Sequence, residues 1–449
     1  MKAIINKSKL FLNSYYYPIF IGCLVLFGHT FSIEVATSIL LLISAGIGLM
    51  VCDDLKFLIS PLIMFIFAFS QKNVSSEMYY SKSYIIAIIA ISIIIVALLV
   101  FHFVYYRKNI SFKPLTRSKV SLGIGLFCVS LLLNGVFSSN SYSSKNIFFA
   151  LITIISLGLI YFLFQINLNN DSSLKKYLFF VLYVASMVLT LELYLSFINQ
   201  IQIVDGSIVK ESVLFGWGMW NNMGGMLAFF LPVHIYFATT SKKFGYLFYF
   251  SAIASYIAIV LTLSRSSLLV SSIVLFACII CSCFLGVNKR TNRIITAILA
   301  VLAILGIIVM WNKLASVLGD YLNRGLDDNG RFEIYKHGFN RFLKSPVFGG
   351  GFATDFKLDY EFVTFIPFRY HNTIIQLLSA CGIVGLLAYL YHRYTTVMML
   401  LKRKNIFSLF SAFCIASLLL CSLLDNHFFN IYPLFGYSLI LVINEKCNN

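Results

Sequence analysis

Three arginines and one histidine stand at the edges of apolar segments, where they could bind an anion and move a proton. Arg265 lies in "LTLSRSSLLV", between two apolar runs with almost no loop. Arg331 begins the stretch "RFEIYKHGFNRFLK", and Arg369 and His371 come just before the apolar run that starts at Thr373. A guanidinium donates two parallel hydrogen bonds to a phosphate, and a neutral imidazole accepts a proton near neutral pH. Together these residue types suit the transfer of a group from a phosphate to a hydroxyl.

Each of these residues also has a structural interpretation. An arginine at the membrane edge can extend its side chain to the interface, which would explain Arg265. A basic amphipathic helix on the outer membrane surface would explain Lys336, Arg341 and Lys344, whereas Arg331 stands in a first turn, where free N–H groups favour an anion. A lone histidine is more often structural, and we interpret three others in this way: His29, His102 and His234.

The stretch that begins with Arg331 predicts an amphipathic helix. Aromatic residues recur in it at three- and four-residue spacing and would share one apolar face: Phe332, Tyr335, Phe339 and Phe342. Pro346 and the glycines at 349–351 would end this helix.

The histidine stands directly before another predicted helix, which starts at Thr373. Asn372 is expected to cap that helix through its side-chain amide. Gly382 and Gly385 are expected to permit close helix packing. The helix would then hold His371 at a fixed position, aimed at a hydroxyl beside a bound phosphate.

The composition places these residues in a membrane protein. The chain is 59% hydrophobic and 11% charged, whereas soluble domains carry about 25% charged residues. We predict an all-α polytopic membrane protein with about 14 (12–14) transmembrane helices. They lie near residues 16–32, 34–51, 57–70, 84–106, 119–137, 147–168, 177–204, 219–239, 244–263, 267–287, 294–311, 373–400, 406–424 and 428–444. The third range is short and contains Pro61, so it could be broken or re-entrant.

The distribution of Lys and Arg predicts the orientation. With the N terminus in the cytoplasm, 21 of the 34 cations lie in cytoplasmic segments and five in short outer loops. This asymmetry predicts that both termini are cytoplasmic and that the long loop 312–371 is extracytoplasmic. The net charge of +17 then reflects membrane orientation rather than nucleic-acid binding. The ten cysteines show no CxxC spacing, so we expect neither a disulfide framework nor a metal site.

Four motifs in the second half resemble the superfamily of O-antigen ligases and Wzy-type polymerases. They follow the family order: "GWGMWNNMGGMLAFFLP", "TLSRSSLL", "DNGRFEIYKHGFNRFLKSPVFGGGF" and "HNTIIQLLSACGIVGLL". They are similar to the family's Gly/Asn-rich entry into a span, its Ser-Arg motif, its Arg-aromatic helix and its His-Asn motif. We therefore divide the chain into N-terminal transmembrane helices 1–7 (1–205) and a ligase-like catalytic membrane domain (206–449) that includes loop 312–371.

The resemblance implies a GT-C-like membrane glycosyltransferase without metal or cofactor. Its donor would be an oligosaccharide linked to undecaprenyl diphosphate, at the outer face of the cytoplasmic membrane, and its acceptor a glycan or lipid hydroxyl. Arg265 and Arg331 would bind the diphosphate, and His371 would activate the acceptor. Four residues would support them: Asn372, Arg369, Tyr335 and Asn222. Membrane lipids and a chain-length regulator would be further partners, but nucleic acid would not.

Three activities remain possible for the chain. Polymerase and ligase both belong to this superfamily, whereas a flippase belongs to a different class of protein. We favour a polymerase that joins repeat units of O-antigen, capsule or exopolysaccharide. A ligase would instead move a finished glycan to lipid A core or another acceptor, and transfer to protein ranks lower. A lipid-linked oligosaccharide flippase would need charged groups near the midplane of several spans. Glu192 is the clear intramembrane acid, and we expect it to be structural.

Overall fold

The structure is a computed structural model that describes residues 2–67, 82–138, 144–204, 207–208, 220–309, 311, 331–352 and 370–447. These residues are almost all helical, as predicted. The strands in the described part are β1 (Ile203–Val204) and β2 (Ser207–Ile208), which pair antiparallel. The all-α prediction therefore missed one short hairpin.

A helix lies in each of the fourteen predicted ranges. The helices are α2 (Tyr16–Phe31), α3 (Glu34–Val51), α4 (Ile59–Met64), α6 (Lys82–Tyr105), α8 (Lys119–Leu132), α9 (Ser144–Thr153) continuing through the π-helical η4 (Ile154–Leu159) into α10 (Ile160–Asn167), α11 (Leu174–Gln200), α12 (Trp220–Thr240), α13 (Gly245–Leu261), α14 (Arg265–Phe284), α15 (Lys289–Val309), α18 (Thr373–Leu401), α19 (Ile406–Leu424) and α20 (Ile431–Lys446). The helices outside these ranges include α1 (Lys2–Leu12), α7 (Lys113–Arg117) and α17 (Arg331–Lys344). Among the described helices, seven are long and apolar enough to cross a membrane, or nine if two bent pairs each count as one span. The number fourteen stays a prediction.

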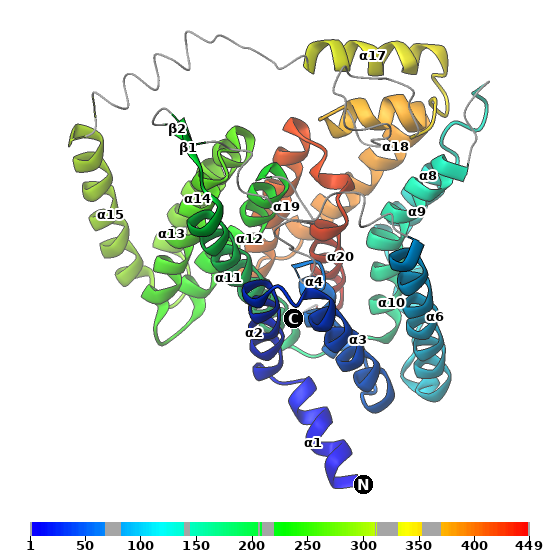
Figure 1. Ribbon diagram of the computed structural model, residues 1–449, viewed down its shortest axis with the longest axis horizontal. Coiled ribbons are helices and arrows are strands. Elements are labelled where there is room, and N and C mark those ends of the chain that lie inside the picture. Colours follow the sequence, from blue (N-terminus) through cyan, green and yellow to red (C-terminus); the bar gives the residue numbers. More distant parts are fainter. Residues whose placement is uncertain are drawn as a thin grey trace.

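Contacts among helix ends and the segments that join them define two ends of the bundle. One end holds the pairs Lys9–Asp53, Lys56–Asp171 and Lys446–Leu168. The other end holds the pairs His371–Asp425, Asn222–Asn430 and Gly135–Phe348. Each pair joins segments that the alternation of spans puts on the same side. In Figure 1, α17 and the hairpin lie at the upper end of the view, and α1 with the N terminus lies at the lower end.

Two helices form the centre of the bundle. Every residue of α12 from Met223 to Thr239 is buried, and so is every residue of α20 from Gly436 to Asn444. Other helices of the bundle surround α12, which packs against α11, α13, α14 and α19. This packing fixes the first turn of α12 at the end of the bundle that holds His371.

The helix behind His371 is broken in the middle. Gly382 has φ 65° and ψ −160°, which is not helical. The break frees backbone groups of residues 379–384, and the segment 346–351 bonds to them with four N–H···O bonds of 2.8–3.2 Å. The expected role of Gly382 in close helix packing is therefore wrong. Its left-handed backbone instead opens α18 so that the segment after α17 can insert.

The inserted segment predicts a strong effect for Gly349→Ala. Gly349 has φ 69°, and a Cβ there would lie 2.4 Å from the carbonyl carbon of Ala380. A strained backbone costs about 1–3 kcal/mol, so we expect a lower melting temperature in detergent and weaker anchoring of α17. The matched control is Gly125→Ala in α8, where a Cβ meets nothing within 4 Å. Equal melting temperatures for the two variants would contradict this account of the insertion.

The face of α17 that packs against the rest of the protein is different from its aromatic face. Ile334 and Gly338 are buried, and a Cβ at Gly338 would lie 2.7–2.8 Å from Ile375 and Tyr370. Phe332 and Phe339 are 68% and 47% exposed. The absence of a side chain at Gly338 lets α17 approach α18 closely. The spacing of the aromatic residues did not indicate this contact.

Arg341 does not have the exposed position that a helix on the membrane surface would give it. It is half-buried, and its Nη2 donates to the carbonyl of Gly350. Lys336 and Lys344 are exposed, as a helix on a membrane surface would require. Arg341 therefore stabilises the segment after α17.

Candidate active site

His371 lies between α17 and the start of α18, at the end of the bundle where α17 packs. Its φ is 44°, a left-handed conformation that residues with a side chain rarely adopt. Such backbone strain concentrates at functional sites. Its side chain is 39% exposed, so the ring remains accessible from outside the protein.

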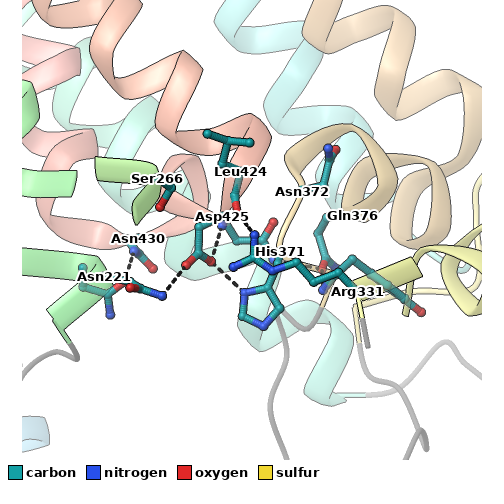
Figure 2. Close-up of polar contacts among 12 residues, drawn as sticks. Asn221, Ser266, Arg331, His371, Asn372, Gln376, Leu424, Asp425 and Asn430 are labelled. Carbon is teal, nitrogen blue, oxygen red and sulfur yellow. Dashed lines mark hydrogen bonds and ion pairs between the residues drawn. The ribbon is translucent and has the colours of Figure 1, made fainter. Parts of the chain in front are cut away.

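The structure pairs His371 with an acid that the sequence analysis did not select. His371 Nδ1 lies 2.9 Å from Oδ1 of Asp425, the residue that follows α19 (Figure 2). A carboxylate at Nδ1 keeps the proton of a neutral imidazole on that nitrogen and leaves Nε2 to accept another. The pair thus has the arrangement of a base and the acid that orients it.

Asp425 is held in its ionised form. Burial by itself would raise the pKa of Asp425, but hydrogen bonds from His371 and from the backbone N–H of Asn426, with the charge of neighbouring imidazoles, lower that pKa below its usual range. Asn221 Nδ2 donates to the other carboxylate oxygen at 3.3 Å. Asp425 therefore carries its negative charge at every pH at which the protein would be assayed.

Arg331 is brought to the same place. It is the first residue of α17, and its Nη1 donates to the carbonyl of Leu424 at 3.1 Å. Leu424 directly precedes Asp425, so the guanidinium lies beside the His371–Asp425 pair (Figure 2). One carbonyl uses one of the five N–H donors of a guanidinium, and an anion could take others.

Arg265 is linked to this group through α12. It begins α14 with an exposed side chain, and Ser267 in the same turn donates to the carbonyl of Asn221 at 3.5 Å. Asn221 in turn contacts Asp425. Figure 2 shows Asn221 and the start of α14 on one side of Asp425, with His371 on the other. The turn that carries Arg265 is therefore part of the same end of the bundle.

The four residues that were predicted to support the site differ in the contacts that they make. Asn372 Oδ1 accepts from the N–H groups of Ile374 and Ile375, at 2.9 and 3.1 Å, so its predicted cap is confirmed. Tyr335 OH reaches the carbonyl of His371 at 3.5 Å, a long contact. Asn222 Oδ1 accepts a hydrogen bond from Asn430 Nδ2 at 2.9 Å. Arg369 lies outside the described residues.

Two residues of this site, Asp425 and Asn221, were missed from the sequence. Asp425 stands in "LLDNHFFN", directly after an apolar span and in a chain with 17 acidic residues. A rare acid at the outer end of a predicted span was the available signal. Asn221 stands beside Asn222 in the Gly/Asn-rich motif, and the sequence does not distinguish which amide faces the acid.

The chemistry available here is proton transfer and anion binding. Among the residues that the structure describes, no group of three or more His, Cys, Asp or Glu side chains is arranged to hold a metal ion. The site offers a base at His371, a carboxylate that orients it, and guanidinium groups at its edges. This set can remove a proton from a hydroxyl and neutralise a phosphate that leaves.

The comparison with known proteins covers part of the chain that forms this site. Residues 250–390, about a third of the chain, match the family model Wzy_C, described as O-antigen ligase. The match includes Arg265, Arg331 and His371, whereas Asn221 and Asp425 lie outside it. No curated protein matches the chain. The family match confirms the resemblance to the O-antigen ligases and Wzy-type polymerases that the sequence motifs indicated.

Proposed function

We propose that the chain is a glycosyltransferase that polymerises polysaccharide repeat units carried on undecaprenyl diphosphate. The observation that carries this proposal is the His371–Asp425 pair with Arg331 beside it, at one end of a bundle of apolar helices. A base next to a cation is what transfer from a diphosphate to a hydroxyl requires. The match to O-antigen ligases supports the same class of reaction.

In the proposed reaction, the acceptor hydroxyl attacks the anomeric carbon of the lipid-linked sugar. A new glycosidic C–O bond forms while the C–O bond to the diphosphate breaks. His371 Nε2 takes the hydroxyl proton, and Asp425 stabilises the resulting imidazolium. Arg265 and Arg331 bind the diphosphate as its negative charge grows. The chain has a GT-C-like arrangement in this proposal, and Glu192, which is fully buried in α11, has a structural role.

We place the site on the extracytoplasmic side of the cytoplasmic membrane, with both termini inside. A cysteine at Asn340, an exposed position on α17, should then react with an impermeant thiol reagent in intact spheroplasts. Lys243→Cys, in the exposed turn between α12 and α13, should react only after lysis. Both variants are made in a Cys23→Ser background, because Cys23 is exposed. The reverse labelling pattern would refute the orientation.

Arg265→Lys should lower turnover while protein levels stay normal. Lysine keeps the charge but loses the fork that binds two phosphate oxygens. A hydrogen bond to a charged group contributes about 1.5–3 kcal/mol, so we expect a roughly 10- to 100-fold loss. Arg290→Lys, at an exposed arginine of α15, is the control and should keep full activity. Full activity in Arg265→Lys would exclude bidentate phosphate binding at that position.

The decisive experiment mixes the purified protein with lipid-linked repeat unit and follows product length on a gel. A ladder of products that disappears in His371→Ala supports the polymerase. No change until a lipid A core acceptor is added would make the chain a ligase. Movement of intact donor across a vesicle membrane, with no new glycosidic bond, would make it a flippase.

A further inference from the structure

A second polar site lies at the opposite end of the bundle from His371. It is a pocket of about 400 Å³ between the start of α8 and the ends of α10, α18 and α20. Its wall includes three cations and one acid: Arg117, Arg403, Lys446 and Glu445. Arg403 follows the 29-residue α18, and His371 precedes it. The part of α18 after its break at Gly382 rises about 28 Å toward Arg403, so the pocket and the candidate active site lie at opposite ends of the bundle.

The acid in the pocket wall, Glu445, accepts hydrogen bonds from uncharged side chains. Glu445 accepts from Ser118 Oγ at 2.5 Å and from Gln165 Nε2 at 3.2 Å, and it also accepts from Tyr161 OH. These three donors hold its carboxylate against α8 and α10. Glu445 therefore has partners that do not need a cation.

The cations of the pocket bond to the backbone instead. Arg403 Nη2 donates to the carbonyl of Glu445 at 3.3 Å, and Lys446 Nζ donates to the carbonyl of Leu168 at 2.7 Å. Within the described ranges, the recorded ion pairs include none of Arg117, Arg403 and Lys446. Three cations and one carboxylate leave the pocket with an excess of positive charge.

We propose that this pocket binds a phosphate group. Two guanidinium groups suit a phosphate because each donates hydrogen bonds in a planar fork. The volume lies within the range of about 300–1,000 Å³ that is typical of ligand sites. The phosphate comes either from an anionic phospholipid of the adjacent leaflet, as in basic pockets between membrane helices, or from a soluble phosphate compound. The proposal is independent of the reaction at His371.

Thermal unfolding of the delipidated full-length protein tests the proposal and separates the two sources. One arm adds phosphatidylglycerol, with phosphatidylcholine as the zwitterionic comparison, and the other adds inorganic phosphate, with chloride at equal ionic strength. A ligand that binds the folded state raises the melting temperature. A rise with phosphatidylglycerol alone indicates a lipid headgroup, and a rise with inorganic phosphate indicates a soluble ligand.

Matched variants assign the effect to the pocket. Arg403→Gln should remove at least half of the rise, and so should Arg117→Gln, whose exposed side chain makes a folding defect less of a concern. Lys404→Gln is the control, because Lys404 is the exposed next residue and does not line the pocket. No rise in either arm, or an undiminished rise in both arginine variants, would overturn the proposal.

Discussion

Replacing His371 by alanine is expected to lower turnover by about 100- to 10,000-fold, the usual contribution of a positioned base. Binding of the lipid-linked donor should persist, because the arginines remain. Only a neutral imidazole can accept the hydroxyl proton, so turnover of the parent protein is compared with that of the variants between about pH 5.5 and 8.5. The measurement is turnover of purified variants over this range, with donor binding measured separately.

Two further variants of His371 separate catalysis from folding. Asparagine tolerates the left-handed backbone at this position, and its amide can replace the Nδ1 contact with Asp425. His371→Asn should therefore fold normally yet lack a base. Glutamine places an amide near the position of Nε2, so His371→Gln would recover activity if that nitrogen only donates or accepts a hydrogen bond. Normal turnover in His371→Ala, or joint loss of donor binding and activity, would reject the role of general base.

Asp425→Asn is expected to reduce kcat by about 100-fold or more while the protein remains folded. The amide has nearly the same shape as the carboxylate, but it cannot stabilise an imidazolium 2.9 Å away. Losing the negative charge makes the imidazolium less stable, so the acid limb of the pH profile should move to lower pH. A merely structural role for Asp425 would lower stability without moving that limb.

The pH dependence of Asp425 itself does not interfere with this test. Its pKa is lowered in the folded protein, despite the opposing effect of burial. The stability it contributes is therefore complete above the unfolded-state pKa of about 3.9 and is lost only as pH falls through the lower folded-state value. Asp53→Asn, at the partly exposed acid that pairs with Lys9 at the other end of the bundle, is the control. Equal pH profiles for Asp425→Asn and the parent would refute the assigned role.

The sequence by itself determined the local features of this protein. Apolar runs placed the helices, because a membrane-spanning segment must bury its backbone polar groups in a helix. The boundaries of α17 and the cap at Asn372 followed from residue types within a few positions. The motifs around Arg265, Arg331 and His371 indicated the family for the same reason, since each motif is contiguous in the chain.

Only the tertiary structure decided which distant groups meet. Asp425 lies 54 residues after His371, and helix periodicity does not say which loops come together at one end of a bundle. The break at Gly382 depends on a segment more than 30 residues earlier that satisfies the freed backbone groups. The face of α17 that packs against α18 was likewise set by the close approach of Gly338, because a helix presents whichever face its neighbour can pack against.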